Sequence, residues 1–559
     1  MKLEYPSYSD GIKSVVQNAF GGFNRQCSAA DGEIYDMLNM TCDHYPVLST
    51  SSPRGINENI TASEGVAMTV CDVADRVIVI SEYNRMSDTD TDVLIYALYA
   101  EYVTADGKRI SESVPLSWRE APYDRKKLLT VSFNRRLAVF YDGEMCMIEI
   151  TKDDDGNDQI TCERIDRVYE GESNSHKDDD YTYISIKDYA GNFTAGDTLS
   201  VYDTQSQTEH YMTLLETADE YNVTTLTFDL NENIFYPNSE TYGEYFVISR
   251  KVPPLEHVCV NRDRIWGTAG NEIYSCASGD MRNWYNYEAT AAASFQAEIY
   301  AVSRFVGCAS FGANVYFFTA EDVYRMYGTT PTAFSLVALG TYGCEEMSGE
   351  SFGVTSHRLF YNSTHGPVVF DGDTASLISR PFGDERITDV RGIAWGGKYY
   401  MATASRLYVY DTRYGAWTAE DMRGIVGMLV LSGRLMMLSD EGALYMDALP
   451  GERVAQVADS YVEFADISEG TMFGVNVSEF ALRVWLGEGA KLKLSISCDG
   501  DPYREIWSTG REGRRTYTVR YSPMTRCESY RLRLDGEGEW KLYSLMRNYT
   551  ATTNQRYGG

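Results

Sequence analysis

The sequence predicts an all-β protein: a β-propeller of about seven blades, a small β subdomain inserted into it, and a C-terminal β-sandwich of jelly-roll type. Three observations lead to this prediction. The 559 residues include 43 Tyr and 46 Gly but only 14 Pro, a balance that suits strands joined by tight turns. A short pattern recurs through the middle of the chain. Runs that alternate between apolar and polar residues occupy its last hundred positions.

The recurring pattern is a turn residue, then a basic or amide residue, then an apolar or aromatic run. Its seven copies lie at 75–79, 135–139, 263–266, 313–317, 357–361, 397–401 and 433–437. A second apolar or aromatic run follows most copies, as at 272–274, 322–324, 406–410 and 443–445. Each copy therefore predicts a β-hairpin, and hairpins at this period are typical of the four-stranded blades of a propeller. Chance recurrence is the alternative, which seven copies in phase disfavour.

One interval between copies, from Arg136 to Arg264, is 128 residues long and exceeds one blade. Residues 166–250 hold 17 acidic and 4 basic side chains and contain strand-like runs at 181–186 and 223–228. Loop tips are the places where a fold tolerates insertions. We therefore expect 166–250 to be an acidic β subdomain that projects from a propeller made of 56–165 and 251–450.

The blade period stops after Leu449, and the composition changes. Residues 455–559 have 14 acidic and 14 basic side chains, and the runs 480–486, 491–496 and 530–534 alternate with period 2. Such runs are strands with one buried face. Residues 451–559 are thus predicted to form the C-terminal sandwich.

The first 55 residues fit neither pattern. They include Phe-Gly-Gly-Phe-Asn at 20–24 and an apolar stretch at 34–40. One interpretation is an extended N-terminal arm that orders contacts between copies, so that a chain without 1–55 would remain a folded, monomeric propeller. The other is that this segment supplies a strand that closes the ring.

The net charge of the chain limits the kinds of molecule that it can bind. Lys and Arg number 50 against 81 Asp and Glu, a net charge of −31, which opposes binding to duplex DNA or to an anionic membrane. The excess of acidic side chains either keeps the chain soluble or forms a repulsive wall beside a channel through which DNA passes. If the chain did bind DNA, the expected contacts would be Arg511, Arg514 and Arg515. No N-terminal signal pattern and no apolar run near about 18 residues is present, so we expect a protein made in the cytoplasm, without a membrane partner.

The sequence predicts no catalytic, metal or cofactor site and no cofactor. The eleven Cys are scattered and read as reduced thiols, and the six His (44, 176, 210, 257, 357 and 365) show no metal-ligand spacing. The acid-rich stretches 88–92 and 153–158 have the wrong spacing for a calcium loop and are expected to be solvated hairpin loops.

One stretch, 275–284, is similar to the Asp-box turn of sialidases, Ser-x-Asp-x-Gly-x-x-Trp, but with Gly and Asp exchanged. Such boxes are structural turns. Retaining glycosidases need two carboxylates about 5 Å apart, and no such pair can be chosen among 81 acidic residues. We expect no enzymatic activity, and a glycan-processing propeller enzyme is the least favoured alternative.

Several segments together resemble a family of tailed-bacteriophage virion proteins, the propeller-bearing tail or neck components of phages of Gram-positive gut bacteria. They are 20–49, 250–253 with 261–267, 273–280 with 283–284, 410–413 with Trp417, and 532–544. The resemblance implies a structural protein of the virion tail or neck, made in the host cytoplasm, homo-oligomeric in the particle and in contact with other virion proteins. It implies no reaction and assigns nothing to 166–250.

A host-surface binding module is the alternative function. In it the C-terminal domain and the acidic subdomain would bind a cell-wall glycan. Exposed aromatic rings would contact the sugar, and Trp485, Trp507 and Trp540 are available for this in the C-terminal domain. Because strands bury alternate residues, at least one of these three is expected in the core. A glycan array with isolated 455–559 would separate the two functions.

Overall fold

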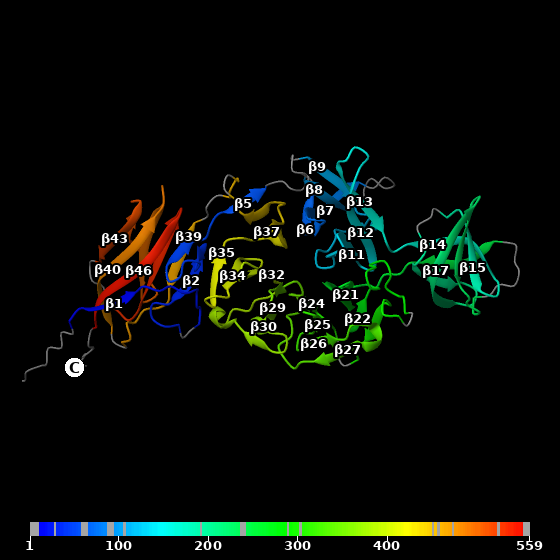
Figure 1. The fold of residues 1–559 in the computed structure, drawn as a ribbon. Coiled ribbons are helices and arrows are strands. Elements are labelled where there is room, and N and C mark those ends of the chain that lie inside the picture. Colours follow the sequence, from blue (N-terminus) through cyan, green and yellow to red (C-terminus); the bar gives the residue numbers. More distant parts are fainter. Residues whose placement is uncertain are drawn as a thin grey trace, which may run out of the picture.

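A computed structural model describes residues 11–26, 29–57, 65–86, 94–103, 108–189, 193–234, 242–287, 290–300, 304–449, 452–455, 459–471, 474–521 and 526–551. Within these residues the regular elements are β-strands and two short 3₁₀ turns, η1 (Pro331–Ala333) and η2 (Arg380–Phe382), which confirms the predicted all-β class. No helix in this part of the chain has the length and apolar character to cross a membrane. Figure 1 shows three units in a row: a sandwich, a ring of small sheets and a barrel.

The ring contains seven four-stranded antiparallel sheets among the described residues. In chain order they are β6 (Val66–Val73), β7 (Arg76–Met86), β8 (Leu94–Val103) and β9 (Arg109–Ser113); β10 (Leu129–Phe133), β11 (Arg136–Tyr141), β12 (Glu144–Lys152) and β13 (Asp158–Arg164); β20 (His257–Asn261), β21 (Arg264–Ala269), β22 (Glu272–Ser275) and β23 (Phe295–Glu298); β24 (Gly307–Phe311), β25 (Asn314–Phe318), β26 (Val323–Tyr327) and β27 (Ser335–Ala338); β28 (Gly353–Val354), β29 (Leu359–Ser363), β30 (Gly366–Phe370) and β31 (Ala375–Leu377); β32 (Arg391–Trp395), β33 (Lys398–Ala402), β34 (Leu407–Asp411) and β35 (Ala416–Glu420); and β36 (Ile425–Leu431), β37 (Arg434–Ser439) and β38 (Leu444–Asp447) with β5 (Arg54–Asn57).

Consecutive sheets share their buried apolar side chains, so the ring is held by burial between sheets rather than by one central core. Ile80 of the first sheet packs with Val139 of the second, for example. The last sheet contacts the first through Leu438 and Val79, which closes the circle. A closed ring of small antiparallel sheets is the architecture of a β-propeller, as the repeat predicted.

All seven copies of the sequence pattern lie at the same place, the hairpin between the first and second strand of each sheet. The turn residues adopt left-handed conformations in several copies, as at Ala74 (φ 48°), Asp75 (φ 64°), Asn134 (φ 50°) and Arg135 (φ 64°). Two-residue turns of this hand match the twist of the flanking strands. The pattern therefore marks one recurring hairpin of the ring.

The inserted segment is a closed six-stranded barrel. Its strands are β14 (Val168–Lys177), β15 (Tyr181–Lys187), β16 (Thr198–Asp203), β17 (Thr208–Glu220), β18 (Val223–Asp229) and β19 (Gly243–Ser249). β19 pairs with both β14 and β16, so the sheet has no free edge. Its own apolar core includes Ile184, Leu199, Leu226 and Phe246, and the barrel projects from the ring (Figure 1).

The sandwich consists of two antiparallel sheets that face each other. One runs β3 (Met40–Thr41), β4 (Leu48–Thr50), β46 (Trp540–Ala551), β40 (Val475–Leu486) and β43 (Gly513–Arg520), with β1 (Lys13–Gln17) on β46 and β44 (Arg526–Cys527) on β40. The other runs β2 (Ile34–Leu38), β39 (Ser460–Phe464), β45 (Tyr530–Glu537), β41 (Lys491–Cys498) and β42 (Arg504–Thr509). Leu482, Leu494 and Leu534 are among the residues of the shared core.

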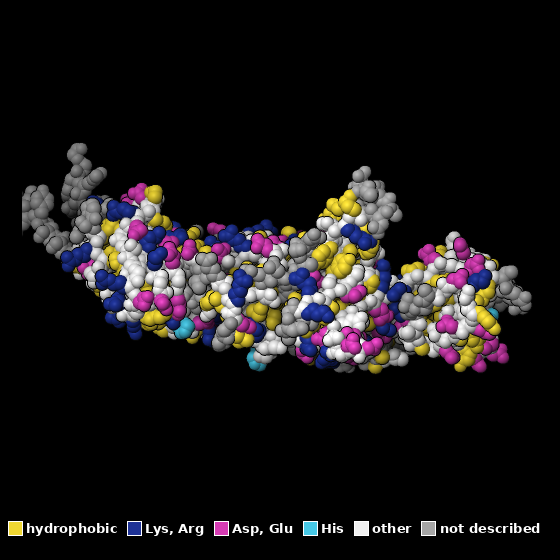
Figure 2. Space-filling model, turned by 90° about the horizontal axis from the view of Figure 1, so that it is seen from above, with side chains coloured by type: hydrophobic (Ala, Val, Ile, Leu, Met, Phe, Trp, Pro, Cys, Tyr) yellow, Lys and Arg dark blue, Asp and Glu magenta, His cyan; other side chains and the backbone are white. Residues whose placement is uncertain are grey.

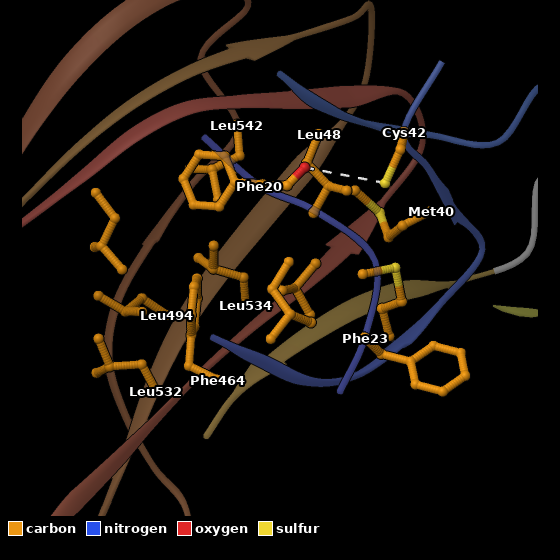
Figure 3. Packing of buried hydrophobic residues seen from close by; sticks show 14 of the residues in the cluster. Phe20, Phe23, Met40, Cys42, Leu48, Phe464, Leu494, Leu532, Leu534 and Leu542 are labelled. Carbon is orange, nitrogen blue, oxygen red and sulfur yellow. Dashed lines mark hydrogen bonds between the residues drawn. The ribbon is translucent and has the colours of Figure 1, made fainter. Parts of the chain in front are cut away.

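The N-terminal segment is not a free arm. β1, β3 and β4 belong to the first sandwich sheet, β2 to the second, and β5 pairs with β38 and closes the ring. Figure 3 shows Phe20 and Leu48 of this segment among core residues of the sandwich such as Phe464 and Leu542. The physical reason is burial: apolar side chains of the segment complete a core that 451–559 cannot close alone.

Candidate interaction surfaces

The first surface is the contact between sandwich and ring, called here the sandwich joint. The N–H of Phe23 donates to the carbonyl oxygen of Trp417 at 2.9 Å. A Cβ on Gly22 would lie 2.2 Å from that same oxygen, so only Gly fits this position. Phe23 and Trp417 are both buried, and each packs edge-on against Phe382 of η2. The Phe-Gly-Gly-Phe motif thus lets the segment pass directly against the ring.

A partly buried ion cluster fixes the same joint. Asp36 of β2 accepts from Arg25 at 2.5 Å and Arg406 at 3.1 Å, and from the Tyr461 hydroxyl at 2.6 Å. Burial opposes ionisation of this carboxyl, but the two guanidinium groups and the hydroxyl outweigh it and lower the pKa of Asp36. Arg406 comes from the ring and Tyr461 from β39, so one carboxylate joins both units to the N-terminal segment.

The second surface, called the barrel joint, is where the barrel meets the ring. Arg250 is 1% and Asp197 3% exposed, and they form an ion pair there. Arg250 also donates to the carbonyl oxygen of Ile165 at 3.1 Å, on the incoming strand connection. At the rim the rings of Tyr211 and Tyr285 stack with centroids 5.1 Å apart. A buried pair of this kind fixes orientation, since neither charge can be left without its partner.

The stretch similar to an Asp box, 275–284, is part of the barrel joint. The side chain of Asn283 accepts from the Thr198 N–H at 2.7 Å and donates to the Gly196 carbonyl oxygen at 3.1 Å. Asn283 also donates to Asp280 at 2.6 Å, and Trp284 is buried below the turn. This stretch is therefore a turn of the ring, and the side-chain amide of Asn283 in it binds the backbone at the base of the barrel.

The third surface is the channel through the ring. A cavity of about 540 Å³ is lined by the first strands of the sheets, including Met68, Cys308 and Gly427. It adjoins a polar mouth of about 1170 Å³, where Lys126 pairs with Asp389 at 3.1 Å and Arg304 with Glu256 at 3.2 Å. Glu350 meets Arg391 at 2.7 Å; enclosure by the channel walls raises the pKa of Glu350, and Arg391 partly offsets this. The mouth can admit a polar molecule between paired charges.

His257 lies where the mouth narrows into the channel, its ring against the backbone of Gly349. Burial lowers the pKa of His257 to about 4, with Arg304 acting in the same direction and Glu256 and a backbone hydrogen bond at Phe305 acting against it. Between about pH 6.5 and 4, His257 is therefore protonated in the unfolded chain but neutral in the folded chain. The free energy of unfolding falls as the pH falls through that window.

We expect His257→Gln to remove this part of the acid sensitivity. Between pH 7.5 and 4.5 the free energy of unfolding should fall less in the variant than in the native chain, by about 1–3 kcal/mol. Urea unfolding at the two pH values measures it. His357→Gln is the control, because His357 is exposed in the turn before β29. Equal pH dependence in all three proteins would contradict the assignment.

The other residues considered in the sequence lie apart from these surfaces. Residues 153–158 span the hairpin between β12 and β13, where Asp153 accepts from the N–H groups of Asp155 and Asn157, as predicted for a loop. Residues 88–92 and Cys27 are outside the described residues. The ten described Cys are free and mostly buried, and burial raises the pKa of Cys71 and Cys276 to about 12. No group of three or more metal-ligating side chains occurs in the described part of the chain.

The three Trp of the sandwich have different surroundings. Trp540 is fully buried and donates to the Ser460 hydroxyl at 2.8 Å, which confirms that one of them is core. Trp507 packs on Tyr517 with ring centroids 4.8 Å apart, at the edge between the two sheets. Trp485 is half-buried on the outer face of its sheet, so glycan binding by the sandwich stays a prediction that rests on Trp485.

The charged residues that build both joints were not found by sequence motifs. Asp197 and Arg250 are 53 positions apart, and Asp36 and Arg406 are 370 apart. Nothing in the local pattern distinguishes them from the other charged residues. The available signal was indirect: Gly22, Arg250 and Asn283 all lie within the segments that carry the resemblance to virion proteins.

No family model matches the sequence, and no curated protein matches it. Many solved structures are similar to it, including the following three, all at low identity. BamB from Moraxella catarrhalis is 9% identical with a TM-score of 0.33, covering 69% of this chain and 96% of its own. Apo AztD from Citrobacter koseri is 12% identical with a TM-score of 0.27, and the match covers 69% of this chain and 98% of AztD. An exo-beta-1,3-galactanase from Phanerochaete chrysosporium is 10% identical with a TM-score of 0.21, and the match covers 52% of this chain and 95% of the galactanase. At these identities and TM-scores, none of the three similarities indicates a function.

Proposed function

We propose that this chain is a non-enzymatic structural protein of a tailed-bacteriophage particle, assembled into its tail or neck and working through contacts with other virion proteins. The observation that carries the proposal is where the family-like segments lie. Residues 20–49 run through the sandwich joint together with Trp417, and 250–253 and 273–284 lie at the barrel joint. Several of the segments that resemble virion proteins thus help to hold the three units together, whereas 261–267 and 532–544 lie in strands of the ring and the sandwich.

The two joints favour a building block over a set of independent modules. The ion pair is buried in the barrel joint and partly buried in the sandwich joint, and the N-terminal segment is shared by sandwich and ring. Such contacts hold three units in one arrangement, because separating them would leave buried charges without partners. In this proposal the ring is a seven-bladed propeller, the C-terminal unit is a jelly-roll sandwich, and the chain acts in the virion after synthesis in the host cytoplasm.

Particle composition tests the proposal. Mass spectrometry of purified particles from the phage that encodes this chain should detect it in amounts comparable to the other tail proteins. Immunogold electron microscopy should place it on the tail or neck. Particles that are complete and infectious but lack the chain would contradict a structural role.

The same proposal predicts negligible affinity for duplex DNA, because a net charge of −31 repels phosphates. Fluorescence anisotropy with a labelled duplex at low and moderate salt measures this. Micromolar binding that weakens steeply with added salt would contradict it and would direct attention to Arg511, Arg514 and Arg515, which are all exposed.

A further inference from the structure

The two ends of the molecule differ in charge. Figure 1 places β43 of the sandwich at one end and β15 of the barrel at the other. Figure 2 shows Lys and Arg side chains along the free end of the sandwich and a predominance of Asp and Glu on the barrel. In the barrel segment, 166–250, acidic residues number 17 and basic residues 4. An acidic barrel and a face of the sandwich that presents Lys and Arg therefore lie at opposite ends of one elongated chain.

The basic end is the outer face of β40, β43 and β46, called here the basic face. Register places Trp485 of β40 between Arg514 of β43 and Lys541 of β46. The Arg514 guanidinium lies 4.0 Å from the centre of the Tyr543 ring, and the Lys541 ammonium lies 5.3 Å from that of Trp485. Cations and aromatic rings alternate across this face at contact distance.

Two arginines of the basic face have no carboxylate partner among the described residues: Arg483 and Arg514. Arg483 is held instead by the Thr516 hydroxyl at 3.3 Å, and Arg514 by the Tyr543 ring. A guanidinium oriented in this way keeps its charge and its paired donors available for an external anion. Arg25 and Arg250 at the joints, by contrast, are satisfied by internal carboxylates.

The acidic end offers a protruding turn that matches this face. The last six residues of β17, 215–220, are all exposed, and they extend beyond the barrel core. Asp219 and Glu220 lead directly into Tyr221, whose side chain is 95% exposed at the turn to β18. Two carboxylates beside an exposed aromatic ring complement arginines that alternate with aromatic rings.

We propose that the Tyr221 turn of one copy docks on the basic face of a second copy, in a head-to-tail contact. Asp219 and Glu220 pair with Arg483 and Arg514, and the Tyr221 ring packs against Trp485 or Tyr543. A contact between different surfaces of identical chains closes into a ring or continues as a filament, depending on the rotation between copies. This contact would explain how the proposed structural protein assembles. It rests on the proposed function only for the location of assembly, which is the phage particle.

Charge reversal tests the contact on the purified full-length chain by sedimentation velocity. The native protein should associate as concentration rises at about 50 mM salt and less at about 500 mM, where screening is stronger. Arg483→Glu with Arg514→Glu, or Asp219→Arg with Glu220→Arg, should each weaken association at least about tenfold. An equimolar mixture of the two double variants should associate, because each then offers the face that the other needs. Tyr221→Ala should weaken association without changing charge.

Control variants reverse a single charge elsewhere on the chain. Arg135→Glu on the ring and Asp179→Arg on the barrel are both at exposed positions and should associate like the native chain. Circular dichroism checks that every variant is folded. A native chain that stays monomeric at all concentrations and salts, or a mixture of reversed variants that stays monomeric, would overturn the inference. So would a monomeric chain whose basic face binds duplex DNA or a cell-wall glycan instead.

The outcomes separate this inference from the structural role. A chain that is present in particles but monomeric in solution by the tests above contradicts the head-to-tail contact alone. A chain that associates as expected but is absent from particles contradicts the structural role alone.

Discussion

Arg250→Met should loosen the barrel from the ring and lower the free energy of unfolding by about 3–5 kcal/mol, because Asp197 is then a buried carboxylate without its ion-pair partner. Chemical unfolding measures the loss. Limited proteolysis should show faster cleavage around residues 165–167 and 250–253, the two connections between the units.

The double variant Arg250→Met with Asp197→Leu removes both charges and should recover much of the stability. Lys251→Met is the matched control, since the pair of Lys251 with Glu209 is partly exposed and should change stability by less than about 1 kcal/mol. Native stability in Arg250→Met would show that the pair does not hold the joint.

Removing the N-terminal segment should have the largest effect of all. A chain that begins at residue 52 loses β1 to β4 and with them Phe20, Phe23, Met37, Met40 and Leu48, each no more than 2% exposed. At about 1.5–3 kcal/mol for each buried side chain, the loss is comparable to the whole stability of a domain of about 5–15 kcal/mol. We expect the sandwich to be unfolded in this chain while the ring, which keeps β5, remains folded.

A chain that begins at residue 65 also lacks β5 and should lose the closed ring, because β38 is then an unpaired edge. Hydrogen exchange resolved by region distinguishes the two truncations, and a chain that begins at residue 11 is the control. Retention of native exchange in the sandwich of the 52–559 chain would contradict the assignment of the segment to its core. The isolated 455–559 fragment is for the same reason unsuited to a glycan array, and the full chain should be used.

The sequence determined the features that are local along the chain. The copy at 135–139 predicts a hairpin because a turn, a polar residue and an apolar run are adjacent, and β10 and β11 form it. The alternation at 480–486 and 530–534 likewise predicted β40 and β45. Period and turn chemistry act over a few residues, so they can be read without the tertiary structure.

The tertiary structure alone decided what depends on distant partners. Phe20 and Ile34 gave no sign that they belong to a core whose other half begins near residue 460, because an apolar residue is compatible with any apolar surface. The interpretation of 1–55 as an arm failed for this reason, whereas its alternative, a ring-closing strand, holds for β5. The pairing of Asp197 with Arg250, and of Asp36 with Arg406, follows from where the barrel and sandwich meet the ring. Electrostatics requires a buried carboxylate to have a cationic partner. Only the folded structure shows which Lys or Arg is that partner.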